Sequence, residues 1–487
     1  MSTGTSRDSW DVVVIGGGAA GENAAQYAIQ GSDRTAVIVE AELVGGECSY
    51  WACMPSKTLL RPVEVLHTVR ALPGIAEMLD GSLDVPAILA RRDRFTHDHD
   101  DSGQVEWAGE NGIGIIRGAA RLTGERVVEV TAPGGATRTI RARQAVVIAT
   151  GSTASIPPIE GLYEARPWTS RDVTNLREVP QRVAIIGGGV VACESATWLI
   201  GLGAREVTMI EIERTLLAQL EPFAGATTAE QFSKLGVRVL LGTEVESVER
   251  PAAQDTGIGR IHGGPAMISA GGSTFEVDEI VVAAGRTPTS AGLGLELVGV
   301  DANAHGYIET DDHMAVPGAG DWLYAIGDVC GRALLTHMGK YQGRIAGSVI
   351  AARAEGRPTD GLRYNDVADH DVVPAVVFTD PQVASVGLTE SAARANGIDV
   401  EALEYDIGAV AGAKVLYDGY TGRAKLVVDR ATDTVVGATF VGSEIAELLH
   451  SATVAIVGKV SLETLWHAVP SYPTVSEVWL RLLESRH

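Results

Sequence analysis

The chain has 487 residues, which at roughly 100–200 residues per domain predicts about three domains. Hydrophobic residues make up 45% and charged residues 21%, a composition typical of globular proteins with large buried cores. The formal net charge of −23 argues against a protein that binds nucleic acid or anionic lipid non-specifically.

The N-terminal segment is polar and lacks the basic and apolar regions of a secretion signal. No apolar run reaches the roughly 18 residues needed to cross a bilayer. Only four cysteines occur, at positions 48, 53, 193 and 330, which is typical of a reducing compartment and not of a disulfide scaffold. We therefore expect a cytoplasmic protein with neither a membrane nor a nucleic acid as partner.

The first predicted element is the apolar strand 11–15, followed by a glycine-rich turn that contains Gly16, Gly18 and Gly21. An alanine-rich helical stretch continues to about Gly31, and a second strand ends at Glu40. This order of strand, G-x-G-x-x-G turn, helix and acid is the context of a dinucleotide-binding site. Backbone N–H groups would approach a pyrophosphate at the helix N-terminus, and Glu40 would accept ribose hydroxyls.

The same pattern returns in the second third of the chain. The strand 182–186 leads into a turn with Gly187 and Gly189, and the next strand ends at Glu211. Glu211 favours the free 2′-hydroxyl of NADH over a 2′-phosphate, although the nearby Arg214 leaves NADPH possible. Two fingerprints, each in its full context, predict two nucleotide-binding lobes in an α/β fold.

Two further apolar strands, 144–152 and 279–288, each follow one fingerprint and end in a turn of small residues. This repeated order predicts two lobes, one interrupted by the other. The additional cofactor-binding candidates in these turns are Thr150, Gly151 and Gly285.

The two close cysteines, Cys48 and Cys53, lie in the string GGECSYWACMPSK. Their spacing suits one turn of chain, so the sulfurs could close a small disulfide ring that stores two electrons. A nucleotide site beside a redox-active thiol pair indicates a flavoprotein that moves electrons. Cys193 and Cys330 are predicted to be small core fillers. We interpret the HDHDD segment 97–101 as a solvated helix face, because no metal-ligand spacing accompanies it, and we predict no metal site.

The sequence beyond about position 343 contains no third nucleotide fingerprint. The segments 373–390, 422–429 and 434–442 are typical of strands and are predicted to form a mixed sheet, and 444–457 and 476–485 have helical spacing. We expect a separate α+β module after a linker near 356–363. The glycine-rich stretch 251–273 is predicted to be a long hairpin inside the second lobe.

These features together resemble the class I flavoprotein disulfide reductases, the pyridine nucleotide-disulfide oxidoreductases that include dihydrolipoyl dehydrogenase and mercuric reductase. The most specific string is C-x-x-x-x-C-x-P-S-K, which ends at Lys57, and YAIGDVCG matches the second FAD motif with Asp328. The resemblance implies tightly bound FAD, NAD(H) with NADP(H) possible, and a homodimer. It also implies an FAD-binding domain of residues 1–153 and 281–350, an NAD(P)-binding domain of 154–280 and a dimerisation domain of 351–487.

Residue roles follow from the resemblance. Cys53 would lie against the flavin as the charge-transfer thiol, and Cys48 would attack the substrate. A helix N-terminus and Lys57 would lower the pKa of the thiols. Lys57 and Glu194 would form the ion pair near the flavin where hydride arrives, and Asp328 would hold the ribityl chain.

One departure from the family pattern affects the chemistry. Disulfide-reducing members carry H-P-T-x-x-E near the C-terminus, and their histidine serves the thiols as acid and base. Here Tyr472 occupies the histidine position, while Glu477 keeps the register. Mercuric reductases resemble the chain in placing tyrosine there, but they add a C-terminal cysteine pair that this sequence lacks. In the cysteine loop, Tyr50 and Trp51 replace smaller residues and could either reshape the substrate pocket or pack against a dimer partner.

We therefore expect an FAD-dependent oxidoreductase. Electrons would pass from NAD(P)H through FAD to the Cys48–Cys53 disulfide and on to a disulfide or another acceptor that needs no histidine base. One alternative is a reductase of quinones or of soft metal ions such as mercuric or cupric ions. Another is a flavin-bearing structural or regulatory subunit.

Overall fold

The computed structural model describes residues 7–79 and 81–486. The chain divides into two compact units, each built from three separate segments. The first unit contains the chain up to Met54, Asp93–Thr153 and Arg286–His370, and the second contains Pro55–Arg92, Ala154–Gly285 and the chain from Asp371 onward. The three-domain division with its predicted boundaries is finer than this and stays a prediction.

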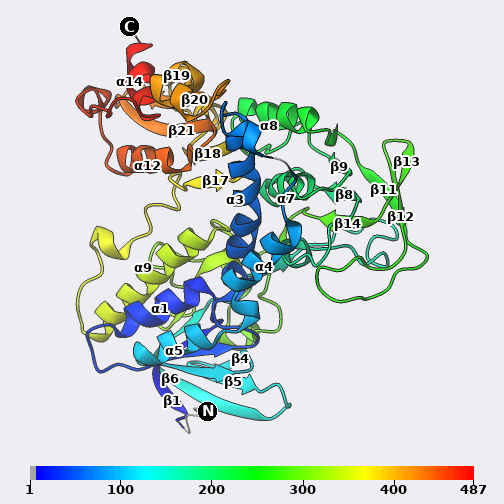
Figure 1. The fold of residues 1–487 in the computed structure, drawn as a ribbon. Coiled ribbons are helices and arrows are strands. Elements are labelled where there is room, and N and C mark those ends of the chain that lie inside the picture. The colour runs from blue at the N-terminus through cyan, green and yellow to red at the C-terminus, as the bar shows by residue number, and fades with distance from the viewer. Residues whose placement is uncertain (1–6, 80, 487) are drawn as a thin grey trace. The chain divides into compact units, whose positions relative to one another are not determined.

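A seven-stranded sheet forms the centre of the first unit (Figure 1). Strands β1, β2, β3, β16 and one part of β6 run parallel, whereas β4, β5 and β6 pair antiparallel. The strands in sheet order are β3 (Ile113–Arg117), β2 (Ala36–Glu40), β1 (Ser9–Ile15), β6 (Thr137–Ile148), β5 (Val127–Thr131) and β4 (Ala119–Gly124), with β16 (Leu323–Ala325) beside β6. The helices of this unit are α1 (Ala19–Ile29), α2 (Gly46–Tyr50), α5 (Ser102–Glu110) and α9 (Thr336–Ala354).

Strand β1 is buried on both faces, which explains its unbroken apolar run. Val12 and Val14 belong to the core beneath α1 and α9, whereas Val13 and Ile15 belong to the core on the opposite face. Side chains alternate along a strand, so a strand with both faces covered needs apolar residues at every position. Helices α1 and α9 lie side by side (Figure 1), and this packing places their first turns next to each other.

The second unit contains a four-stranded parallel sheet and a three-stranded antiparallel sheet. The parallel sheet comprises β10 (Arg238–Leu241), β9 (Glu206–Glu211), β8 (Arg182–Ile186) and β14 (Glu279–Val282), and the antiparallel sheet comprises β11 (Val245–Glu249), β12 (Ala266–Ala270) and β13 (Ser273–Val277). The predicted hairpin is thus formed by β12 and β13, later in the chain than the stretch 251–273 suggested, and its first half is irregular. The helices here are α3 (Cys53–Arg70), which begins at the unit boundary, α4 (Val85–Phe95), α6 (Ser170–Thr174), α7 (Val190–Gly201) and α8 (Pro222–Lys234).

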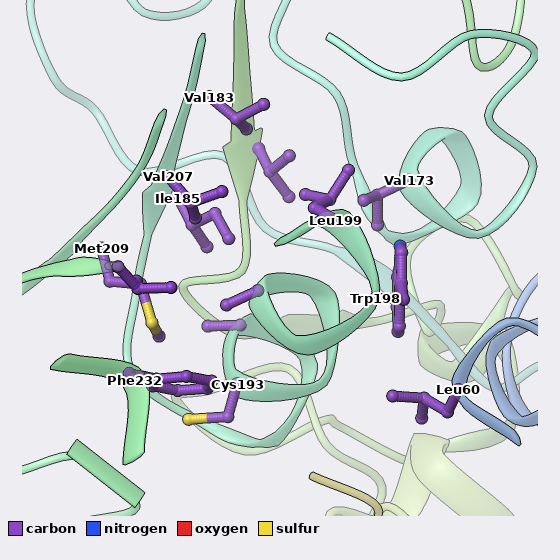
Figure 2. Close-up of a cluster of buried hydrophobic side chains, with 14 of the residues drawn as sticks. Leu60, Val173, Val183, Ile185, Cys193, Trp198, Leu199, Val207, Met209 and Phe232 are labelled. Carbon is purple, nitrogen blue, oxygen red and sulfur yellow. The ribbon is translucent and has the colours of Figure 1, made fainter. Parts of the chain in front are cut away.

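Helix α7 is buried at every position from Ala192 to Leu199. Figure 2 shows Cys193 of this helix beside Phe232 and Met209, in the cluster that also contains Trp198. Burial raises the pKa of the Cys193 thiol, so it is an unreactive core residue as predicted. A helix that is apolar on all sides belongs in a core.

A five-stranded sheet forms the last part of the second unit, and it is antiparallel throughout and not mixed as predicted. Its strands in order are β17 (Ala375–Val377), β18 (Gln382–Gly387), β21 (Thr434–Gly442), β20 (Arg423–Asp429) and β19 (Val400–Asp406). The helices are α10 (Glu390–Ala395), α11 (Ala411–Leu416), α12 (Leu449–Val457), α13 (Leu462–Leu465) and α14 (Glu477–Glu484).

The HDHDD segment is not the helix face that was predicted. Residues His97–His99 form a 3₁₀ turn in which all three residues have positive φ, between 49° and 62°. Across the described residues, no three His, Cys, Asp or Glu side chains are grouped so that they could hold a metal ion. No helix in the same residues is long and apolar enough to span a membrane.

Candidate active site

The first glycine turn joins β1 to α1 and leaves no room for a side chain at Gly16 or Gly21. A Cβ on Gly16 would lie 2.3 Å from the Ala149 carbonyl oxygen, and one on Gly21 would lie 2.1 Å from the oxygen of Gly16. Gly18 caps α1 without any side-chain hydrogen bond, so the first N–H groups of the helix remain available to an anion. The turn therefore fits the pyrophosphate of a dinucleotide.

Glu40 lies at the end of β2 and braces this turn. Its carboxylate accepts hydrogen bonds from the backbone N–H groups of Gly17, at 2.6 Å, and Glu42, at 2.7 Å. Each carboxylate oxygen can accept more than one hydrogen bond, so the side chain can still accept ribose hydroxyls.

Asp328 lies on the 3₁₀ turn Gly327–Cys330, in the same unit. The Ser152 hydroxyl donates to its carboxylate at 2.5 Å, and the Arg286 guanidinium lies 3.5 Å from it. Nearby, the Thr150 hydroxyl donates to the Thr289 carbonyl at 2.6 Å, and Gly151 has a φ of +71°. Asp328 thus has polar partners in Ser152 and Arg286, which directly follow the predicted residues Gly151 and Gly285 in the chain. The sequence gave no signal for Ser152 and Arg286.

The second glycine turn repeats the first one in the second unit. A Cβ on Gly187 would lie 2.4 Å from the Ala283 oxygen, and Gly189 caps α7 without a side-chain hydrogen bond. Glu211 accepts a hydrogen bond from the Glu213 N–H at 2.7 Å, as Glu40 does from Glu42. Gly285, the predicted residue of the following turn, has a φ of +129° with open space where its side chain would be. This turn fits a second dinucleotide.

Lys57 and Glu194 form the predicted ion pair. The Lys57 ammonium donates to both carboxylate oxygens of Glu194, at 3.0 and 2.7 Å, and lies 4.8 Å from the centre of the Phe378 ring. The Phe378 backbone N–H also donates to Glu194 at 3.0 Å. Glu194 is the one acid in the buried stretch of α7, and a buried carboxylate requires such partners.

Cys48 lies in α2 and Cys53 begins α3, and both thiols are half-buried. The Cys48 thiol is hydrogen-bonded to the Cys53 sulfur. The Thr336 hydroxyl, at the start of α9, lies 3.3 Å from the Cys53 sulfur. The structure therefore brings the two predicted thiols together and adds a hydroxyl to them.

The pKa of the Cys48 thiol is raised, first by its hydrogen bond to Cys53 and then by burial and by the charge of Cys53. The Thr336 hydroxyl and the charge of Lys340 act in the opposite direction. The expectation of a lowered pKa is thus wrong for Cys48, because its closest neighbour is a second sulfur that carries the negative charge. When the pair has lost one proton, Cys48 holds the proton that remains.

Tyr50 and Trp51 pack inside the first unit. Their ring centres lie 5.7 Å apart, and His99 lies 6.0 and 5.6 Å from them. Both are buried, and the Tyr50 hydroxyl donates to the Val44 carbonyl at 3.0 Å. The two aromatic residues therefore stabilise the cysteine loop through contacts inside the first unit.

Tyr472 and Glu477 do not form a dyad. Tyr472 is 76% exposed, and Glu477 is buried with one oxygen bonded to Arg481 at 2.6 Å. The other oxygen of Glu477 has no hydrogen-bond partner in the described part of the chain. The glutamate of the family motif is present, and Tyr472 stands at the position of the family's histidine.

Comparison with known proteins identifies the chain's relatives. The family described as pyridine nucleotide-disulphide oxidoreductase matches residues 10–356, and its dimerisation domain matches 373–482. Dihydrolipoyl dehydrogenase of Chlamydia muridarum is 32% identical, over 97% of this chain and 96% of its own. Mercuric reductase of Lysinibacillus sphaericus is 30% identical, over 96% and 81%. The solved structure of LpdA from Mycobacterium tuberculosis has a TM-score of 0.82 at 24% identity, with 98% of this chain and 99% of that chain covered.

The fold and the two nucleotide turns, together with the thiol pair, define an oxidoreductase that uses FAD and NAD(H) and acts on sulfur groups. The chain belongs to the pyridine nucleotide-disulphide oxidoreductase family. The predicted family, fold class, enzyme class and cofactors are confirmed, and the dimerisation domain supports the predicted homodimer.

Replacement of Glu211 tests the nucleotide preference. In Glu211→Ser we expect the ratio of kcat/KM for NADPH to kcat/KM for NADH to rise about tenfold or more. The reason is that a carboxylate no longer faces the 2′-phosphate. Steady-state kinetics with both nucleotides measures this ratio. Glu206→Ser, at the other end of β9, is the control and should leave the ratio unchanged. An unchanged ratio in Glu211→Ser would contradict the assignment.

Proposed function

We propose that the protein is an NADH-driven reductase whose Cys48–Cys53 pair delivers two electrons to an acceptor that needs no histidine base. The acceptor class that fits best is a disulfide whose leaving thiol is acidic. The observation that carries the proposal is the hydrogen bond between the two thiols, which supplies the attacking cysteine with a proton acceptor of its own. Tyr472, at the position of the family's histidine, supplies no imidazole for this purpose.

Cys48 and Cys53 can carry out all proton and sulfur exchange steps of disulfide reduction without another side chain. Bound FAD supplies a carrier that takes two electrons from NADH and can pass them to the cysteine disulfide. In the reduced pair, Cys48 gives its proton to the Cys53 sulfur and becomes the attacking thiolate. Attack on an acceptor disulfide forms a mixed disulfide and releases one acceptor thiolate. Cys53 then loses the proton to solvent or to that thiolate and attacks Cys48, which restores the cysteine disulfide and releases the second acceptor thiolate.

The missing base limits which disulfides can be reduced. A tyrosine of pKa near 10 is ionised in only about one molecule in a thousand at pH 7. A thiolate leaves faster when the pKa of its thiol is lower. An aromatic disulfide releases thiolates that are stable at neutral pH, whereas an aliphatic dithiol such as reduced lipoamide must be protonated as it leaves. The proposed active site therefore favours the first kind of acceptor.

A comparison of two disulfides tests the proposal. We expect the purified enzyme to reduce 5,5′-dithiobis(2-nitrobenzoate) with a kcat/KM about 100-fold higher than that for lipoamide. A general base contributes at least about this factor to the rate, and only lipoamide reduction depends on such a base. Anaerobic steady-state assays measure both rates. Equal rates for the two disulfides would contradict the proposal.

Tyr472→His is the matched gain-of-function variant. The variant restores the H-P-T-x-x-E motif of the family and adds an imidazole, so lipoamide reduction should rise by on the order of 100-fold, with the aromatic disulfide changed only a few-fold. Tyr472→Phe removes the hydroxyl without adding a base and should leave both rates within a few-fold of the original. A lipoamide rate that does not respond to Tyr472→His would contradict the inferred role of this position.

A second candidate function is reduction of a soft metal ion. A mercuric reductase is 30% identical over 96% of this chain, and a pair of thiolates binds soft ions well. Mercuric ion would then be a substrate held by Cys48 and Cys53. Quinone reduction, the other alternative, needs no thiol, so a cysteine variant separates the two.

A further inference from the structure

The charge of Lys340 acts on both Cys48 and Glu22, and the sequence singled out neither Lys340 nor Glu22. Lys340 is in the first turns of α9, four residues after Thr336, so the two side chains share one face of the helix. The Thr336 hydroxyl lies 3.3 Å from the Cys53 sulfur, so this face of α9 points toward the thiols. The charge of Lys340 acts on Cys48 accordingly.

Glu22 is the second charged residue, and it lies within reach of the Lys340 charge. It is in the first turn of α1, which packs closely against the first turns of α9, since a Cβ on Gly339 would lie 3.2 Å from the Cβ of Ala20. One carboxylate oxygen of Glu22 is buried and has no hydrogen-bond partner in the described residues. The same Lys340 charge acts on this carboxylate. Lys340 is thus within electrostatic reach of both the thiols and a buried acid.

We propose that Lys340 is a positioning residue that stabilises the thiolate of the Cys48–Cys53 pair, and that Glu22 is the counter-charge that limits this effect. The inference rests on the proposed function of the pair, because it concerns how readily the same thiols ionise. The sequence had led us to expect this electrostatic role of Lys57, but the Lys57 ammonium is hydrogen-bonded to both carboxylate oxygens of Glu194. Residues of α9 and α1 take the role in its place.

The two residues act with opposite signs. Burial raises the pKa of Glu22 to about 7, and Lys340 opposes that rise. Below about pH 7 Glu22 is therefore mostly neutral, and the charge of Lys340 acts fully on the thiols. Above pH 7 Glu22 is ionised and offsets part of that charge. Tyr50 also lies near Glu22 and stays neutral in this range, because burial raises its pKa to about 12. The other charges that act on Tyr50 are those of Asp101, Asp100 and Arg117.

Alkylation of the reduced holoenzyme tests the proposal without NADH or any acceptor. The enzyme is reduced chemically, and the rate of iodoacetamide addition to Cys48 is followed by mass spectrometry between pH 5.5 and 9. We expect Lys340→Met to slow the reaction about fivefold at pH 7, since only the thiolate reacts. Lys340→Arg should keep the rate within about twofold. Because Lys340 is exposed, the effect of Lys340→Met should shrink in 0.5 M salt.

Glu22→Gln should change the rate in the opposite direction. At pH 8 we expect alkylation to become about two- to threefold faster, because Lys340 is no longer offset, whereas at pH 5.5 the rate should not change. Arg121→Met and Glu129→Gln, which alter a surface ion pair between β4 and β5, are the matched controls for net charge.

Each result has a defined meaning. Equal rates for Lys340→Met and Arg121→Met would overturn the role of Lys340, and slower alkylation in Glu22→Gln at pH 8 would overturn that of Glu22. A slow rate in Lys340→Arg would show that packing, and not charge, matters at this position, which also overturns the proposal. Failure of the proposed function would appear separately, as an enzyme whose thiols alkylate as expected but are not reduced by NADH.

Discussion

Cys48→Ser should lower the NADH-driven reduction of an aromatic disulfide by a factor on the order of 1,000 or more, because it removes the attacking nucleophile. Cys53→Ser should cause a comparable loss, since Cys48 then has neither a proton acceptor nor a sulfur that resolves the mixed disulfide. Steady-state rates under anaerobic conditions measure the effect. A loss of less than about tenfold in both variants would mean that electrons bypass the pair.

The same variants separate the alternative acceptors. Quinone reduction should stay within a few-fold of the original rate in both, whereas mercuric ion reduction should be lost with either thiol. As a control, Cys193→Ala and Cys330→Ala should retain the thiol-dependent activity, because both residues are buried and burial raises their pKa. Mass spectrometry after alkylation should count two additional thiols per chain once NADH has been added to the original enzyme.

Glu279→Ala should be the most destabilising single change, at about 3–5 kcal/mol. Glu279 begins β14 and pairs with Arg250 at 2.7 Å, and both side chains are completely buried. Burial raises the pKa of Glu279, and the Arg250 guanidinium opposes that rise. Without the carboxylate, the guanidinium is left as an uncompensated charge in the core. At about 2–4 °C per kcal/mol, the apparent Tm of the holoenzyme should fall by roughly 10 °C.

Glu276→Ala is the matched control. It breaks an ion pair with Arg182 in which both side chains are partly exposed, so the cost should stay below about 1 kcal/mol. The double variant Arg250→Met with Glu279→Leu should recover most of the lost stability, because apolar side chains replace the buried charges. Equal Tm values for Glu279→Ala and Glu276→Ala would contradict the inferred importance of burial.

Several features could be predicted from the sequence because they depend on local order along the chain. In both nucleotide turns, glycine is required at the positions where a Cβ would collide with a backbone carbonyl oxygen. An apolar strand directly precedes each turn. The strand 434–442 was predicted with the bounds that β21 has, because its apolar run is bounded by turn residues. The HDHDD segment was predicted wrongly, because its helix-compatible pattern gives no signal for three consecutive residues with positive φ.

By itself, the sequence determined the family, the fold class and the cofactors, since these follow from residue types at fixed short spacings. The same spacing singled out the two cysteines that we propose as the reactive pair. The sequence could not determine the electrostatics of the thiols. Lys340 lies about 290 residues from Cys48 along the chain, and only the fold lets its charge act on that thiol. The packing of α9 against α1 also brings Glu22 within reach of the same charge. Charges act through space, so the tertiary structure alone decided which residues control the ionisation of the pair.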